Sequence, residues 1–173
     1  LFEDNFAKFC KTKYAVAVSN GTSALHLALI SLGIGEGDEV IIPSLTFVAT
    51  AAAVVHCGAT PVFVDSEELY GTICTSSVEK AITKKTKAII VVHLYGHPAE
   101  MDIINSIAEK NSLFVIEDAA EAHGAKYKSR LVGGIGNIGT FSFYGNKIIT
   151  TGEGGMITTN DEKISSRIKY LRD

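Results

Sequence analysis

Short apolar runs alternate along the chain with segments whose apolar residues recur every third or fourth position. This pattern predicts strands at 14–19, 40–42, 61–65, 88–93, 113–117, 140–143 and 156–159. It predicts helices at 2–11, 24–32, 46–56, 76–82, 98–110 and 161–171. Strands that are apolar on both faces are typical of a parallel sheet covered by helices on either side. We therefore expect one α/β domain over residues 1–173, with an α/β/α arrangement around a mostly parallel sheet.

The residues that follow each strand are the candidates for function, because ligands of such sheets bind beyond the carboxyl ends of the strands. Asn20, Gly21, Thr22 and Ser23 follow the first strand and open a helix. Free N–H groups, a glycine and two hydroxyls can seat a phosphate, although an ordinary helix cap is the commoner explanation. Phe47 follows the second strand, where it either stacks on a planar ring or joins the core.

Two acids, Glu117 and Asp118, stand where the strand at 113–117 ends. Carboxylates at the end of a buried strand are costly unless they are paired or functional. An Asp in this position can hold a pyridine nitrogen in its protonated form, because a neighbouring carboxylate raises the pKa of the ring. The alternative is a cap for the turn that follows.

A single lysine, Lys147, lies between the aromatic strand at 140–143 and the glycine-rich segment at 152–155. Partial burial beside a flexible turn would suit a lysine that forms a Schiff base. Taken alone, the segment is better explained by a surface lysine next to a hairpin turn. The glycines allow the backbone to turn sharply or to approach a ligand closely.

Composition narrows the classes of function. Of the 173 residues, 46% are apolar and 20% are charged, and the net charge is −3. This balance gives no electrostatic footprint for nucleic acid or an anionic membrane. The apolar runs are also too short to cross a bilayer. We therefore expect neither a nucleic acid nor a membrane as a partner.

Three cysteines, Cys10, Cys57 and Cys74, lack the spacing of a zinc site or of a disulfide framework. They indicate reduced thiols in a cytoplasmic protein, and we predict no metal site. The chain begins with Leu1 and Phe2 and carries acidic residues at Glu3 and Asp4, where a signal peptide would carry basic ones. Because the first residue is not Met, we expect the chain to be a piece of a longer protein.

Other patterns carry less weight. Gly134–Gly139 matches GxGxxG, but an aromatic strand follows it instead of a helix, so a dinucleotide site is not predicted. His93 and His97 lie in a loop that precedes a proline, and metal binding by this pair is the minor alternative. His123 follows the acidic end of the strand and is expected near the same site.

Five segments of the chain, taken in order, resemble the DegT/DnrJ/StrS family of pyridoxal-phosphate sugar aminotransferases, which have fold type I. The segments are SNGTSAL at 19–25, PSLTFVAT at 43–50, VHLYGHPAEMD at 92–102, EDAAEAHGA at 117–125 and FSFYGNKIITTGEGG at 141–155. The resemblance implies the large, aspartate aminotransferase-like domain of that fold. The smaller C-terminal domain of the family would be absent, because the family's chains are about twice as long.

The resemblance also implies roles for individual residues. Lys147 would be the catalytic residue that carries pyridoxal 5′-phosphate as a Schiff base. Asp118 would pair with the pyridine nitrogen, and Phe47 would lie against the face of the ring. Glu121 stands where many relatives have Gln, at a position that reaches the phenolic oxygen of the cofactor. A second carboxylate there would either be protonated or point elsewhere.

The resemblance places the phosphate of the cofactor on Gly21, Thr22 and Ser142, with Ser23 as a further candidate. It implies an amino donor, expected to be L-glutamate, and a keto-sugar nucleotide as acceptor. The chain looks most similar to the members that aminate a GDP-linked 4-keto-6-deoxymannose for surface polysaccharide. It also implies a homodimer whose second subunit completes the phosphate and substrate pockets.

Two other functions remain open. A sugar dehydratase of the same family would carry His in place of the lysine, so Lys147 argues against it. A regulatory domain that keeps the fold without catalysis would not need the catalytic set. The joint presence of Lys147, Asp118 and Ser142 argues against that alternative.

Overall fold

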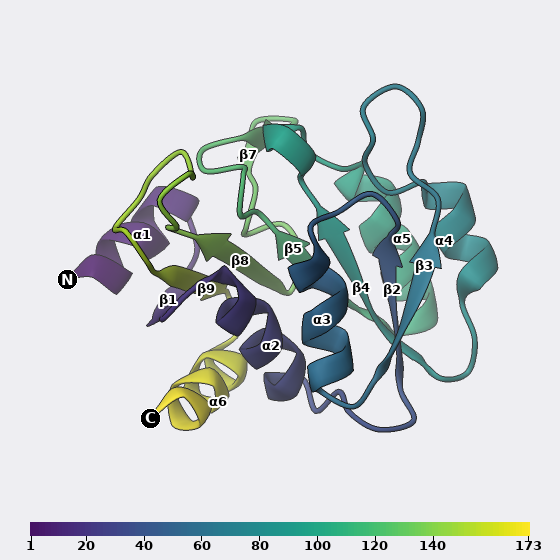
Figure 1. Ribbon diagram of the computed structural model, residues 1–173, viewed down its shortest axis with the longest axis horizontal. Helices are drawn as coiled ribbons and strands as arrows, with labels where there is room; N and C mark the ends of the chain where they lie inside the picture. Colours follow the sequence, from purple (N-terminus) through teal and green to yellow (C-terminus); the bar gives the residue numbers. More distant parts are fainter.

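A seven-stranded sheet forms the middle layer of the computed structural model, which describes residues 1–173 (Figure 1). From edge to edge the strands are β1 (Tyr14–Val18), β9 (Gly155–Thr159), β8 (Ile138–Ser142), β5 (Phe114–Asp118), β4 (Thr86–Val92), β2 (Glu39–Pro43) and β3 (Thr60–Val64). All of the strands run parallel except β9, which is antiparallel to both of its neighbours. The prediction of a mostly parallel α/β sheet is therefore confirmed.

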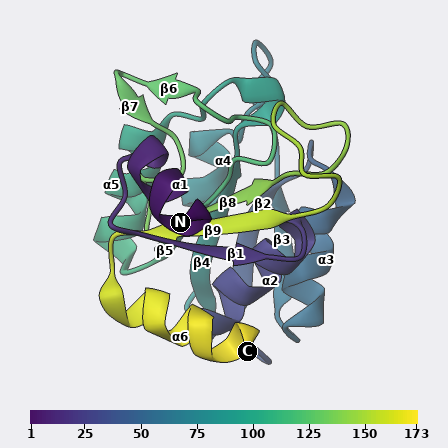
Figure 2. The same cartoon turned by 90° about the vertical axis from the view of Figure 1, so that its left-hand side faces the viewer.

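Helices cover both faces of this sheet. On one face lie α2 (Gly21–Ser31), α3 (Val48–His56) and α6 (Glu162–Arg172). On the other lie α1 (Phe2–Cys10), α4 (Thr75–Ala81) and α5 (Met101–Asn111), with α1 packed against β1 and β9 (Figure 2). A short 3₁₀ turn, η1 (Leu94–Gly96), and a hairpin of β6 (Lys126–Tyr127) and β7 (Arg130–Leu131) complete the chain.

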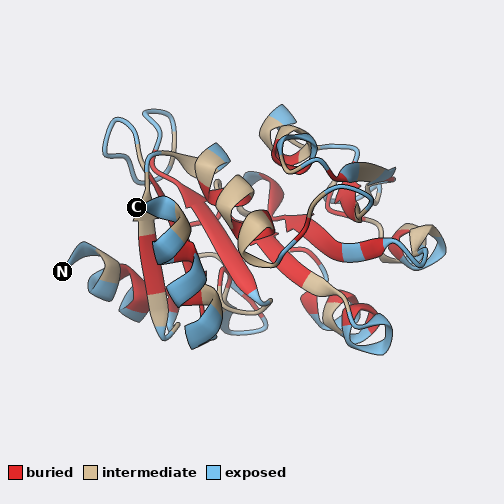
Figure 3. Cartoon of the chain, turned by 90° about the horizontal axis from the view of Figure 1, so that it is seen from below, coloured by how far each residue is buried: buried red, intermediate tan, exposed pale blue.

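The strands are apolar on both faces because each face has its own core. In β4, Ala88 and Ile90 pack toward α2 and α3, whereas Ile89 and Val91 pack toward α4 and α5. Figure 3 shows the strands as a buried centre and the outer faces of the helices as exposed. Each fully buried Ile or Val contributes about 1.5–3 kcal/mol of hydrophobic stabilisation. This double burial is what makes the runs of the sequence continuous instead of alternating.

Some predicted boundaries differ from the structure. The helix predicted at 46–56 begins at Val48, and the strand predicted at 140–143 spans Ile138–Ser142. The strand predicted at 40–42 extends to Pro43, which pairs with Val64 of β3 and lies beyond Ile41, the last residue of β2 that pairs with β4. The β6–β7 hairpin was not predicted because it has only two residues in each strand. None of the helices is long and apolar enough to span a membrane.

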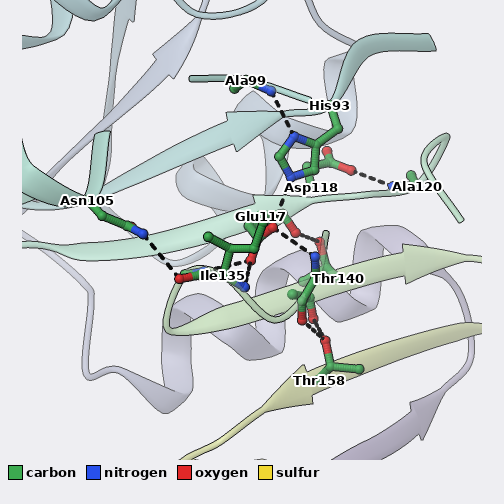
Figure 4. A network of polar contacts seen from close by, with 12 residues as sticks. His93, Ala99, Asn105, Glu117, Asp118, Ala120, Ile135, Thr140 and Thr158 are labelled. Carbon is green, nitrogen blue, oxygen red and sulfur yellow. Dashed lines mark hydrogen bonds and ion pairs between the residues drawn. The ribbon is translucent and has the colours of Figure 1, made fainter. Parts of the chain in front are cut away.

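A buried carboxylate joins three parts of the fold (Figure 4). Glu117 is completely buried, and its carboxylate accepts the N–H groups of Gly133, Ile135 and Gly136 at 2.7–2.8 Å. It also accepts a hydrogen bond from Nε2 of His93 at 3.0 Å. The loop that contains GxGxxG thus directs backbone N–H groups at an internal carboxylate, which agrees with the rejection of a dinucleotide site.

The tautomer of His93 follows from its second hydrogen bond. Nδ1 of His93 accepts the N–H of Ala99 at 3.1 Å, so the ring carries its proton on Nε2 and donates it to Glu117. Burial raises the pKa of Glu117, but the hydrogen bonds from His93, Gly136 and Gly133 outweigh burial and lower the pKa below its usual value. One of the two acids at the end of β5 is therefore fully paired.

We predict that Glu117→Gln lowers the free energy of unfolding by about 3 kcal/mol, because the amide would direct its own N–H group at backbone donors. The lowered pKa implies that the wild-type contribution is present above about pH 4.3, the unfolded value, and is lost as the pH falls through the folded pKa. Urea unfolding across a pH series measures both effects. Exposed Glu109→Gln is the control, and equal stability of the two variants would contradict the prediction.

Candidate active site

The residues that follow the parallel strands meet around one cavity of about 820 Å³. All eight residues predicted from the sequence line it: Gly21, Thr22, Ser23, Phe47, Asp118, Glu121, Ser142 and Lys147. They come from the ends of β1, β2, β5 and β8, which point to the same edge of the sheet. The topology therefore brings together residues that are far apart along the chain.

The first turn of α2 lies directly against the end of β8. Asn20 caps the helix, and its side chain accepts the N–H of Ser23 at 2.8 Å. A Cβ atom on Gly21 would stand only 2.8 Å from Cβ of Ser142, so glycine is required for this close approach. The N–H groups of the helix N-terminus and the hydroxyls of Thr22 and Ser142 thus line the same part of the cavity, and such a group of donors favours an anion.

Of the two acids at the end of β5, Asp118 lines the cavity and Glu117 does not. It is only 7% exposed, and its Oδ1 accepts the N–H of Ala120 at 3.2 Å. Its Oδ2 accepts the hydroxyl of Thr50, on α3, at 3.1 Å. Burial raises the pKa of Asp118, and the hydrogen bonds from Ala120 and Thr50 offset burial only in part. A buried carboxylate with a raised pKa is suited to a cationic partner in the cavity.

Lys147 extends into the cavity from the loop between β8 and β9, and its side chain is 18% exposed. Its Nζ atom lies 3.4 Å from Oε1 of Glu121. Glu121 therefore points into the site, and its other oxygen accepts the N–H of Tyr95 at 3.2 Å. Tyr95 has a left-handed backbone with φ of 52°, a conformation that is uncommon outside glycine.

The loop that carries Lys147 closes at a neck formed by Phe143. The N–H of Phe143 donates to Gly154 at 2.8 Å, and its carbonyl accepts the N–H of Thr151 at 3.0 Å. The side chain of Thr150 donates to the same carbonyl at 3.0 Å. Gly152 and Gly154 have positive φ, so the sharp turn predicted for the glycine-rich segment is present.

Phe47 is 73% exposed at the start of α3, where it lines the cavity. The alternative of a core Phe is therefore wrong for this residue. An exposed aromatic ring at the rim of a cavity costs hydrophobic free energy in the free protein, and a planar ligand would recover that free energy. The structure leaves the ring in a place where stacking is possible.

The three histidines considered in the sequence analysis, His93, His97 and His123, do not form a metal site. His97 stacks on Tyr70 with ring centroids 4.0 Å apart, whereas His93 binds Glu117, so the two do not form a pair. His123 packs among aromatic rings that include Phe141 and Phe143 and does not line the cavity. Burial lowers the pKa of His123. No cluster of three or more His, Cys, Asp or Glu side chains is arranged to hold a metal ion.

Only eight of the 23 residues that line the cavity were predicted from the sequence as site residues. Thr46, Tyr95 and Glu153 line the cavity, and Thr50 reaches Asp118 from behind its wall. In the helix predicted at 46–56, the spacing of Thr46 and Thr50 would place both hydroxyls on one face. The helix begins at Val48, so Thr46 approaches Thr50 from the segment that precedes α3. Tyr95 and Glu153 carry no such signal, since Tyr95 lies in the short turn η1 and Glu153 in the loop between β8 and β9.

The fold and this cavity define a class of α/β enzyme domain with a lysine and a buried carboxylate at the strand ends. The model of the DegT/DnrJ/EryC1/StrS aminotransferase family matches residues 1–173, and the chain belongs to this family. The predicted family and the predicted fold are thus confirmed.

Several characterised relatives are similar over nearly the whole chain. The chain is 54% identical over 171 residues to the GDP-perosamine synthase of Caulobacter vibrioides. The aligned residues cover 99% of this chain and 46% of that protein. The chain is also 47% identical over 173 residues to the dTDP-3-amino-3,4,6-trideoxy-alpha-D-glucose transaminase of Streptomyces venezuelae, with 99% and 46% covered. The chain thus spans about half the length of the curated relatives it matches.

Solved structures agree with this assignment. The aminotransferase from Psychrobacter cryohalolentis is 52% identical, with a TM-score of 0.96 over 97% of this chain and 43% of that chain. The PLP-form of the protein Spr1654 from Streptococcus pneumoniae is 32% identical, with a TM-score of 0.93 over 98% of this chain and 48% of that chain.

We predict that Asp118→Asn makes the cofactor-free protein more stable at neutral pH. The amide can still accept the N–H of Ala120 and can donate to Thr50, while the buried charge is removed. Since the folded pKa of Asp118 is raised, its stabilising contribution is present at low pH and is lost as the pH rises through the folded pKa.

The gain in stability should therefore shrink toward acidic pH, and urea unfolding of the cofactor-free protein measures it. Asp65→Asn, at an exposed position after β3, is the control. A variant at Asp118 that is less stable than the wild type at neutral pH would show that the carboxylate is not a destabilising charge.

Proposed function

We propose that the protein is a pyridoxal-phosphate-dependent aminotransferase that acts on a keto-sugar nucleotide. The observation that carries the proposal is one cavity that holds Lys147, Asp118 and the seat formed by Gly21 and Ser142. A lysine, a buried acid and an anion seat are the three groups that this cofactor requires for its aldehyde, its ring nitrogen and its phosphate. The family of the chain supports the same function.

The residues fit the cofactor in chemical type. The phosphate would be held by the first turn of α2, which supplies N–H groups at Gly21 and Thr22, and by the hydroxyl of Ser142. Ser23 also lines the cavity, but its hydroxyl lies 3.1 Å from that of Ser19, so it is the weaker candidate. Phe47 would cover one face of the ring.

Each residue then has a distinct task. The bound cofactor supplies an electron sink for the carbon that loses a proton. Asp118 keeps a proton on the ring nitrogen, because its carboxylate is buried and favours a cation next to it. Lys147 holds the cofactor and, once its amine is free, moves the proton of the donor carbon, a type of catalysis worth about 10²–10⁴-fold. Glu121 orients Nζ of Lys147 from 3.4 Å.

The substrates are inferred from the relatives. The GDP-perosamine synthases of Caulobacter vibrioides and Escherichia coli O157:H7 are 54% and 55% identical to the chain. This similarity supports GDP-4-keto-6-deoxymannose as the acceptor, L-glutamate as the amino donor and a cytoplasmic role in surface polysaccharide or O-antigen synthesis. A dehydratase of the family is disfavoured because a lysine, instead of a histidine, enters the cavity.

A second subunit and a C-terminal domain belong to the same proposal. Large aromatic side chains that line the cavity are exposed, among them Phe47, Tyr95 and Tyr144. Exposed apolar groups that gather near a site are typical of surfaces covered by another chain or domain. We propose that the intact protein is a homodimer in which such contacts complete the pockets for phosphate and substrate.

We expect the intact protein with pyridoxal phosphate to show a visible absorbance band that borohydride removes. The reduction should leave the cofactor covalently attached to Lys147 as a label. Lys147→Ala should lower amino transfer by at least about 10²–10⁴-fold, because the proton-moving amine is gone. Mass spectrometry of the reduced protein locates the label, and exposed Lys126→Ala is the control. A label on Lys126 or Lys128 would refute the assignment.

We also predict that Gly21→Ala weakens the binding of pyridoxal phosphate by about tenfold or more, the equivalent of one strong hydrogen bond. The added methyl group would stand 2.8 Å from Cβ of Ser142 and would push that side chain out of the seat. Gly35→Ala is the matched control, since its nearest neighbour would lie 3.6 Å away and Gly35 does not line the cavity. Absorbance titration measures both affinities, and equal affinities would exclude the seat.

A further inference from the structure

Two threonines connect the buried side of Asp118 with the wall of the cavity. The hydroxyl of Thr50 lies 3.1 Å from Oδ2 of Asp118, and the hydroxyl of Thr46 lies 2.8 Å from that of Thr50. Thr50 is completely buried on α3, whereas Thr46 is half-buried and lines the cavity. The three groups form a chain that runs from the carboxylate to the cavity.

The direction of this chain follows from the number of protons. An ionised carboxylate only accepts hydrogen bonds, so the single hydroxyl proton of Thr50 must point to Asp118. Thr46 must then donate to Thr50. If Asp118 takes up a proton, all the donors can reverse, because each hydroxyl both donates and accepts. A backbone N–H such as that of Ala120, by contrast, can only donate, so it pairs only with an oxygen of Asp118 that accepts.

We propose that Thr50, supported by Thr46, is a positioning residue for Asp118, and that this hydroxyl pair stabilises the ionised state of the carboxylate. The inference rests on the proposed function in one respect, since that function requires an ionised Asp118 beside a ring nitrogen. The reversible donor direction keeps every polar atom of the group satisfied in both charge states. This matters at a buried position, where an unsatisfied donor or acceptor is costly.

No side chain other than Thr50 of α3 donates a hydrogen bond to the carboxylate of Asp118. The titratable groups that act on its charge are His93, which follows β4, and Lys147, which lies after β8. His93 directs its ring at Glu117 and Ala99, and its backbone N–H donates to the carbonyl of Asp118 at 3.0 Å. Among side chains, therefore, only Thr50 donates a hydrogen bond to the carboxylate.

Thr50→Val tests the inference, because valine keeps the shape and the burial of threonine and removes the hydroxyl. In the cofactor-free intact protein, urea unfolding is measured at neutral and at acidic pH. We expect the ratio of the two unfolding equilibrium constants, neutral over acidic, to rise about tenfold, which corresponds to a shift of one unit in the pKa of Asp118. Thr50→Ser keeps the hydroxyl and should restore the wild-type ratio.

The same substitution in an Asp118→Asn background provides the decisive comparison. With no carboxylate to ionise, Thr50→Val should cost the same stability at both pH values. A loss that does not depend on pH in the wild-type background would overturn the inference, as would a serine variant that behaves like valine. These measurements need no cofactor, so a failure to bind pyridoxal phosphate would count against the proposed function and leave this test valid.

Discussion

A carboxylate that leaves water must meet donors or a cation, and β5 ends in two such groups side by side. Because successive residues of a strand face opposite sides of the sheet, Glu117 and Asp118 meet different environments. Glu117 accepts hydrogen bonds from backbone N–H groups of the loop after β7 and from Nε2 of His93. Asp118 receives only two donors and keeps the raised pKa that burial causes. Glu117, whose hydrogen bonds are satisfied, links β5 to the loop after β7 and to His93. Asp118, which has fewer donors, would be stabilised by a positive charge in the cavity.

The rest of the site is arranged around this difference. The parallel strands end at one edge of the sheet, and β9 runs the other way, so that its first residue, Gly155, lies against Asn20 and Gly21. The helix N-terminus of α2, the hydroxyl of Ser142 and the amine of Lys147 therefore gather on the open side of Asp118. Electrostatic groups held by rigid elements need little reorganisation when charge develops, which is the usual basis of their catalytic value.

The sequence predicted the elements and the site to the extent that each depends on local pattern. The apolar runs identify the strands, and the rule that ligands bind at strand ends selects Gly21, Asp118 and Lys147 without knowledge of the contacts. The orientation of Glu121 was left open, because it depends on a loop whose left-handed Tyr95 supplies the N–H. The contact of Thr50 with Asp118 joins positions 68 residues apart, and only the fold reveals it. The antiparallel direction of β9 was likewise not predicted, because β9 is buried on both faces like β4, β5 and β8, which run parallel to one another.

The hydrogen bonds of Phe143 close the loop that carries Lys147 at its base, so that the loop depends little on the segments that follow it. Because the carbonyl and the N–H of one residue bind the far end of the loop, the segment that carries Lys147 closes on itself before the chain continues into β9. The position of the amine is then determined by the end of β8 and not by the segments that follow it. Segments further along the chain, such as α6, can diverge in length and shape without moving the amine of Lys147. A scaffold of this kind can change what it recognises while the place of its chemistry stays constant.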